Sequence, residues 1–250
     1  MPKAVLIALN IFYHLLTAAV TALHFLVVVP LTLLLSPPLR GGGLSEAARL
    51  AAWLYGRIAL ASLHPFLRVE KRGMGDIPRE GGAVVIFNHK SPYDIHVMSS
   101  IPSPRLAFAA KGWPFRLPAF STLMRMAEYI DVERLGDDEF LEAGEKLLKK
   151  GVFVCVAPEG RRSPDGRLGK FGLGAFKLAQ RTGAPIVPVI LEGMERFEFH
   201  SFPLTRPASV VFEALPPIRP ENFDPELGAL EMRKLARKLY MDKPGDKSQP

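Results

Sequence analysis

The chain opens with a long stretch that contains no charged side chain. Residues 4–35 hold no Asp, Glu, Lys or Arg, and about 20 apolar residues are enough for a helix to cross a bilayer. A cleaved signal peptide fits poorly, because the stretch is too long and lacks a clear small-residue cleavage site. Ser36-Pro37-Pro38 and Gly41-Gly42-Gly43 then predict a break in the helix. The pattern predicts a membrane-binding first helix.

A second helix is predicted over residues 44–64, which are rich in Ala and Leu. Ser45 is its candidate cap, and His64-Pro65 ends the pattern. The body of this helix contains Arg49 and Arg57. Because an arginine at the bilayer centre costs about 2.5–3.5 kcal/mol on insertion scales, a second full crossing is disfavoured.

Two arrangements of these helices remain open. Either the first helix spans the bilayer and the second lies at its interface, or both form a hairpin embedded in one leaflet. The hairpin is favoured, because polar side chains interrupt the first stretch, namely Asn10, His14 and His24. Only Lys3 precedes that stretch, whereas several basic residues follow it: Arg40, Arg49, Arg57, Lys71 and Arg72. This asymmetry predicts that the main domain lies on the cytoplasmic side of the cell membrane.

From residue 67 onward, short apolar runs rich in Val and Ile alternate with helical patterns, as in a chain of buried strands and covering helices. The predicted strands are 83–87, 106–109, 129–132, 152–157, 186–191 and 209–212, and the predicted helices are 137–150, 175–182 and 225–240. The alternation predicts an α/β fold with a mostly parallel central sheet flanked by helices. The expected division is a membrane-anchoring segment at 1–65, an α/β domain at 66–241 and a disordered tail at 242–250.

Composition adds charge to this picture. The 250 residues carry a formal net charge of +7 and are 48% hydrophobic, a balance that favours anionic partners such as lipid headgroups or phosphorylated substrates. Nucleic acid is not an expected partner, because no basic motif or stacking platform accompanies the charge. The single cysteine, Cys155, excludes a disulfide within the chain, and the six histidines are scattered, so no metal site is expected.

The first candidate for chemistry follows the strand at 83–87, where the chain reads Asn88-His89-Lys90-Ser91-Pro92-Tyr93-Asp94. Ligands bind at the carboxyl ends of strands in parallel sheets. The chain turns here, so the Asp94 carboxylate can orient the His89 imidazole and leave its other nitrogen as a base. The same spacing also fits a capping box from Ser91 to Asp94, with Pro92 at the first helical position. Spacing alone favours the capping interpretation.

Further polar stretches are expected at the same edge of the sheet. The strand at 152–157 is followed by Pro158-Glu159-Gly160-Arg161-Arg162-Ser163, whose paired guanidinium groups suit a phosphate, although arginine pairs also occur in solvated loops. A glycine-rich run at 167–174 leads into a helix, whose amino terminus favours anions. Lys111 lies in another cationic loop near this edge.

In this order, the stretches resemble the blocks of the glycerolipid acyltransferase family, and in particular of bacterial 1-acylglycerol-3-phosphate acyltransferases. The resemblance covers about residues 67–215. The N-H-x4-D block is met by Asn88, His89 and Asp94, and the F-P-E-G-T-R-S block resembles residues 157–163. A V-P-V block followed by glycine is met by Val187-Pro188-Val189 and Gly193, and a segment ending in arginine resembles residues 131–134. The departures are Arg161 in place of threonine, and Gly172 and Leu173 where lysines commonly stand.

The resemblance implies an enzyme of phospholipid biosynthesis that transfers a fatty acyl group from a thioester to the sn-2 hydroxyl of lysophosphatidic acid. His89 is then the general base and Asp94 its orienting partner, and Glu159, Gly160, Arg162, Lys111 and Arg134 are candidate substrate-binding residues. No cofactor is implied; acyl-carrier protein or coenzyme A carries the acyl group. Glycerol-3-phosphate, another lysophospholipid or a lyso-aminolipid are alternative acceptors. A non-catalytic membrane-binding protein is the more distant alternative.

Overall fold

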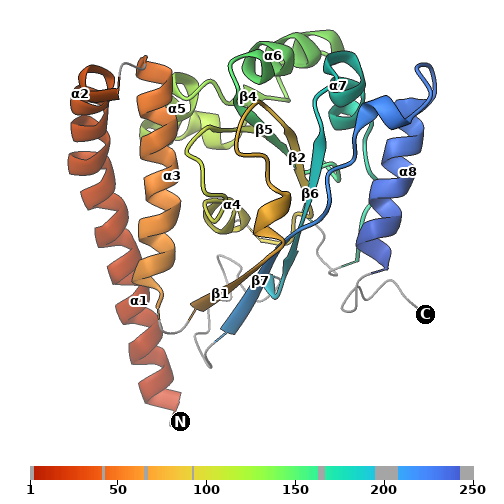
Figure 1. Cartoon of the computed structure of the whole chain (residues 1–250). Coiled ribbons are helices and arrows are strands. Elements are labelled where there is room, and N and C mark those ends of the chain that lie inside the picture. Colours follow the sequence, from red (N-terminus) through yellow and green to blue (C-terminus); the bar gives the residue numbers. More distant parts are fainter. Residues whose placement is uncertain are drawn as a thin grey trace.

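The computed structural model of the chain describes residues 3–40, 43–64, 67–91, 93–162, 167–194 and 208–242. Its strands form one sheet in the order β1-β7-β6-β2-β5-β3-β4 (Figure 1). Every neighbouring pair is parallel except β6 and β7. The strands are β1 (Leu67–Arg72), β2 (Val84–Phe87), β3 (Leu106–Ala110), β4 (Ile130–Asp131), β5 (Phe153–Val156), β6 (Ile186–Glu192) and β7 (Ala208–Ala214). The predicted α/β class and mostly parallel sheet are confirmed.

Strand β1 was not predicted, and its position explains why. It lies at the edge of the sheet, paired with β7 alone, and its pattern alternates Leu67 and Val69 with exposed charged residues. A strand with a solvated face carries no continuous apolar run. The central strands do, because both of their faces are covered: all four residues of β2 are buried.

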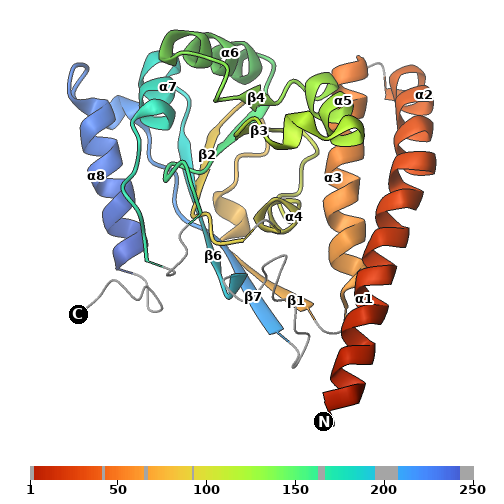
Figure 2. The same ribbon diagram turned by 180° about the vertical axis from the view of Figure 1, so that it is seen from behind.

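Helices cover both faces of the sheet. One face carries α3 (Leu44–Ser62), α4 (Asp94–Met98) and α5 (Pro118–Met126), and the other carries α6 (Asp137–Lys149), α7 (Gly174–Thr182) and α8 (Gly228–Met241) (Figure 2). Alternate residues of β2 enter the two cores: Val85 and Phe87 pack with the first group, and Val84 and Ile86 with the second. Helix α8 begins three residues later than predicted, because the Asp224 carboxylate accepts backbone N–H bonds in a turn that precedes it.

The amino-terminal apolar stretch forms one long helical rod of α1 (Lys3–Leu23), a π-helical turn (His24–Val28) and α2 (Val29–Arg40). Pro30 has no N–H to donate, and the wider turn before it absorbs the misfit: the Val29 N–H bonds to the carbonyl of His24. The predicted break at Ser36-Pro37-Pro38 is wrong, because α2 continues to Arg40. The backbone φ of proline is helical, and so close to the helix end few hydrogen bonds are lost.

Helix α3 runs back beside this rod and packs against both α1 and α2 (Figure 1). It begins at Leu44, as the predicted range did, but Gly43 is its cap, so the prediction that Ser45 caps it is wrong. Trp53, Leu60 and Leu63 of this region pack into the same core as the sheet. The expected boundary between a membrane-anchoring segment and the α/β domain at residue 65 stays a prediction. Most of the expected tail at 242–250 lies outside the described residues.

By length and composition alone, Ile7–Ser36 could cross a membrane: its mean hydropathy is 2.3, and only 11% of an 18-residue window within it is buried. The rod exposes many large apolar residues, namely Val5, Ile7, Ile11, Phe12, Leu15, Leu23, Leu26, Val27, Leu31, Leu34 and Leu35. A helix of 38 residues (Lys3 to Arg40) is about 57 Å long, at 1.5 Å per residue, which exceeds the ~30 Å hydrocarbon core. These features point to association with a membrane.

Candidate active site

Asn88 anchors the loop that follows the central strand β2. Its side-chain amide donates to the Leu191 carbonyl over 2.9 Å and its side-chain oxygen accepts from the Leu191 N–H over 2.7 Å. This two-point contact joins the loop to β6, the strand that contains the Val187-Pro188-Val189 block. The sequence showed both blocks without showing that they meet. The contact holds the next residue, His89, at the carboxyl edge of the sheet.

The Asp94 carboxylate lies at the centre of this loop and is fully buried. Its Oδ2 atom is 2.8 Å from His89 Nδ1 and accepts N–H bonds from Lys90 (2.7 Å) and Ser91 (2.9 Å). The bond from Ser91 is the one that a capping box would use, and Ser91 Oγ accepts the Tyr93 N–H over 3.1 Å. The prediction that Ser91 caps the helix is nevertheless wrong, because Tyr93 precedes the first helical residue and no side chain caps the helix. The Asp94 oxygen instead closes the loop while it contacts the His89 ring.

The His89 ring is left with one nitrogen for chemistry. Nδ1 donates to Asp94 in the tautomer that this contact favours, so Nε2 carries a lone pair. The side chain is 27% exposed, whereas that of Asp94 is 0% exposed. Helix α4 begins at Asp94 itself, two residues later than a cap at Ser91 would give, and Pro92 lies outside the described residues.

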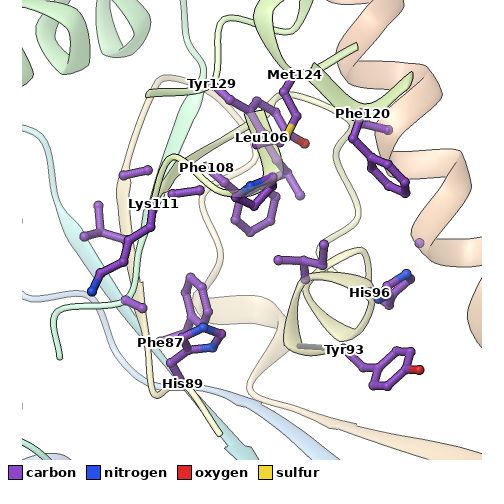
Figure 3. Close-up of a pocket in the computed structure, with 18 of the residues that line it drawn as sticks. Phe87, His89, Tyr93, His96, Leu106, Phe108, Lys111, Phe120, Met124 and Tyr129 are labelled. Carbon is purple, nitrogen blue, oxygen red and sulfur yellow. The ribbon is translucent and has the colours of Figure 1, made fainter. Parts of the chain in front are cut away.

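The His89 side chain lines a cavity of about 1080 Å³ that lies between the sheet and the helices α3, α4 and α5 (Figure 3). Away from His89 its walls are mostly apolar, with Trp53, Leu106, Phe108, Phe120, Leu123 and Met124 among them. Cavities that hold drug-sized ligands are about 300–1,000 Å³. This one is therefore large enough for a long apolar chain.

Cationic side chains gather at the end of the cavity near His89. Lys111, on the loop after β3, and Arg161 and Arg162, on the loop after β5, all line it and are exposed. Gly160 joins them: its φ of +67° and its N–H bond to the Ala157 carbonyl make a tight turn. Arg134 is exposed on the loop after β4 and is not among the lining residues.

Glu159 differs from the other predicted substrate-binding residues because its carboxylate contacts the protein backbone. Oε1 accepts the His89 N–H over 3.1 Å, and Oε2 accepts the Gly169 N–H over 2.7 Å. Burial raises the pKa of this carboxyl group, and the two amide bonds partly offset that effect. Glu159 is not among the residues that line the cavity. Gly169 had no signal in the sequence beyond its place in a glycine-rich run.

The structure also bears on nucleophilic chemistry at the cysteine and on metal binding. Cys155 is fully buried in β5, and burial raises the pKa of its thiol, so it is not a nucleophile at neutral pH. Among the residues that the structure describes, no three His, Cys, Asp or Glu side chains come close enough together to hold a metal ion.

Taken together, these features define an α/β protein with a paired histidine and aspartate beside a large, mostly apolar cavity that cationic side chains also line. The chain belongs to the Acyltransferase family, whose sequence model matches residues 68–192. That span includes β1 to β6 and every predicted site residue.

The chain is also similar to proteins from plants and bacteria. The chain is 34% identical over 139 residues to the chloroplastic 1-acyl-sn-glycerol-3-phosphate acyltransferase of Brassica napus, a match that covers 54% of this chain and 40% of the relative. It is 31% identical over 145 residues to the 1-acyl-sn-glycerol-3-phosphate acyltransferase of Pseudomonas aeruginosa, covering 56% of this chain and 53% of that protein. These matches span about half the length of the relatives or less.

The fold as a whole is that of a solved structure. The crystal structure of the 1-acyl-sn-glycerophosphate (LPA) acyltransferase from Thermotoga maritima superposes with a TM-score of 0.74, covers 94% of each chain and shares 24% of its sequence. The likeness therefore extends beyond the catalytic region to nearly the whole chain, including most of the amino-terminal helices.

Proposed function

We propose that this protein is a 1-acylglycerol-3-phosphate O-acyltransferase, which transfers a fatty acyl group from a thioester to the sn-2 hydroxyl of lysophosphatidic acid and forms phosphatidic acid. The observation that carries this proposal is the contact between His89 Nδ1 and Asp94 Oδ2, which leaves Nε2 as a base beside a large apolar cavity. The names of the relatives support the same acceptor.

The reaction needs no enzyme nucleophile. Nε2 of His89 removes the proton from the acceptor hydroxyl as its oxygen attacks the thioester carbonyl. The new C–O bond gives a tetrahedral intermediate, which collapses as the C–S bond breaks, and the imidazolium returns its proton to the departing sulfur. The products are an ester and a free thiol. Asp94 stabilises the imidazolium that forms between the two steps, and a base of this kind contributes about 10²–10⁴-fold to the rate.

The cationic residues suit the phosphate of the acceptor. Arg162 offers a planar fork of donors that matches a phosphate bidentately, and Lys111 adds a flexible positive charge. Gly160 forms the tight turn directly before Arg161 and Arg162 and adds no side chain there. Arg161 lies on the cavity lining where the family's block has threonine, so it supplies a further positive charge. Arg134 stays a candidate for a more peripheral contact.

The acyl donor is either acyl-carrier protein or coenzyme A, and no further cofactor enters the proposed reaction. The protein would act at the cell membrane with its α/β domain on the cytoplasmic side. The rod and α3 run side by side as the two arms of a hairpin, and this supports insertion into one leaflet. Protease accessibility of the amino terminus in sealed vesicles separates that arrangement from a span.

The test is transfer by the purified protein from acyl-coenzyme A and from acyl-carrier protein. Wild type is expected to acylate lysophosphatidic acid faster than glycerol-3-phosphate, other lysophospholipids or a lyso-aminolipid. His89→Ala should lower the rate by about 100- to 10,000-fold, because the general base is lost. Asp94→Asn should lower it by about 100-fold through misorientation of the ring. His64→Gln, at an exposed histidine outside the cavity, is the control. Full activity of His89→Ala would refute the proposed mechanism.

A further inference from the structure

The Glu159 carboxylate joins two loops that are distant in sequence. Glu159 belongs to the loop after β5, and its two oxygens bind the backbone N–H of His89, after β2, and of Gly169, in the glycine-rich run before α7. Strands β2 and β5 are hydrogen-bonded neighbours in the sheet. The carboxylate therefore crosses from one strand end to the next and fixes the backbone of the catalytic histidine directly.

Space and charge both argue against contact between this carboxylate and the acceptor. Glu159 is not among the residues that line the cavity, and both of its carboxylate oxygens already bind backbone N–H groups. A phosphate that approached it would meet a charge of the same sign. By contrast, positive charge on His89 and Lys90 favours the ionised carboxylate. A cation that forms on the His89 ring during the reaction is therefore stabilised by Glu159 as well as by Asp94.

Gly169 is fitted to the same contact. A Cβ atom added to it would lie 2.9 Å from Glu159 Oε2, which is closer than van der Waals contact allows. Gly172, in the same loop, differs: an added Cβ would meet only the Pro158 carbonyl, at 3.5 Å. The lack of a side chain at residue 169 thus leaves space for the Glu159 carboxylate, whereas at residue 172 there is space for a methyl group.

We propose that Glu159 is a positioning residue for the general base, holding the His89 backbone through one carboxylate oxygen and the Gly169 amide through the other, and that it does not bind the acceptor. This inference rests on the proposed function of His89. It replaces the acceptor-binding role that the family resemblance implied for Glu159, and it gives Gly169 a role in the same device.

The experiment compares Glu159→Gln, Gly169→Ala and the matched control Gly172→Ala in two reactions. The first is acyl transfer to lysophosphatidic acid, with kcat and KM measured separately. The second is hydrolysis of acyl-coenzyme A without acceptor, in which His89 activates water instead of a hydroxyl. A residue that positions the base affects both reactions, whereas an acceptor ligand affects only the first.

In Glu159→Gln the side-chain amide has only one oxygen, so it can accept only one of the two backbone N–H bonds. In Gly169→Ala the new methyl group displaces the carboxylate. Both are expected to lower kcat by about 100-fold, the loss that about 1 Å of misplacement can cause. KM for lysophosphatidic acid should stay within about twofold, and hydrolysis should fall in parallel. Gly172→Ala should behave as wild type.

A rise in KM with unchanged hydrolysis would make Glu159 an acceptor ligand and overturn the inference, as would full activity of Glu159→Gln. If Glu159→Gln fails to fold, Gly169→Ala against Gly172→Ala decides. The proposed function has its own measure, because a wild-type protein that acylates no acceptor refutes that function, while the hydrolysis assay still tests the position of His89.

Discussion

At the residue scale, one oxygen atom orders the whole loop after β2. Asp94 Oδ2 contacts the His89 ring and accepts two backbone N–H bonds, and the bond from Ser91 imitates a capping box although the helix starts later. The spacing of His89 and Asp94 therefore could not separate a cap from a side-chain pair. The site is also bordered by a second histidine. His96, two residues after Asp94 on α4, lines the cavity, and burial lowers its pKa to about 4.

This burial predicts a pH-dependent loss of stability. In the unfolded chain His96 binds a proton below about pH 6.5, whereas in the folded chain it does so only below about pH 4. The free energy of unfolding therefore falls as the pH drops through this window. The slope for one proton is about 1.4 kcal/mol per pH unit. His96→Gln should lower that slope by the contribution of one proton, measured by urea unfolding of the full chain in detergent, whereas His64→Gln should leave the slope unchanged. An unchanged slope in His96→Gln would contradict the assignment.

At the element scale, the short helix α4 holds Asp94 in place by packing. Its Val97 and Met98 are fully buried, and α3 approaches it at Gly56. A Cβ added to Gly56 would lie 2.7 Å from the Ser99 Cβ, at the end of α4. The lack of a side chain at residue 56 therefore allows α3 and α4 to lie this close together.

Gly56→Ala is expected to destabilise the protein, although alanine favours a helix over glycine by about 1 kcal/mol. Overpacking at a fixed helix contact costs about 1–3 kcal/mol, and movement of α4 should also slow acyl transfer. Gly144→Ala in α6 is the comparison, because its new Cβ would crowd the buried Leu178 side chain in the other core and would not touch α4. Thermal unfolding and acyl transfer of both variants check this. Equal effects in the two helices would show that the close approach at Gly56 does not matter.

At the scale of the whole molecule, one side is apolar and lies next to the cavity. The rod exposes Leu26, Leu31 and Leu34 to 76%, 49% and 70%, while Thr17, Thr21 and Phe25 on its inner side line the cavity. The same helix that presents an apolar surface outward thus forms part of the cavity wall, so the apolar surface and the cavity lie on two sides of one helix.

Polar substitution on this outer surface should weaken membrane binding. Leu26→Gln combined with Leu34→Gln is expected to lower binding to vesicles of equal parts phosphatidylcholine and phosphatidylglycerol by at least about tenfold, because each buried leucine contributes about 1.5–3 kcal/mol. The control combines Leu227→Gln with Leu235→Gln, exposed leucines at the far side of the sheet around α8. Flotation of both proteins with the vesicles measures the difference. Equal loss in both would place the membrane-binding surface elsewhere.

The amino-acid sequence by itself determined the fold class, the position of most strands and the blocks that carry chemistry. Buried strands such as β2 and β5 are read from local patterns, because continuous apolar runs bounded by polar residues have few other structures open to them. The uncharged stretch likewise indicated the long apolar helix at the amino terminus. It did not show that this helix continues through Pro37 and Pro38, which is possible because the φ angle of proline is compatible with a helix.

Only the tertiary structure decided which polar groups meet. The bonds of Asn88 to Leu191 and of Glu159 to His89 and Gly169 join residues 103, 70 and 10 positions apart, and no local pattern encodes such distances. It also brought Lys111, Arg161 and Arg162 to one end of a cavity and left Arg134 off its lining. His89 and Asp94 were named from the sequence, but the sheet register and the packing of α4 place them 2.8 Å apart, because a hydrogen bond depends on position in space and not on order along the chain.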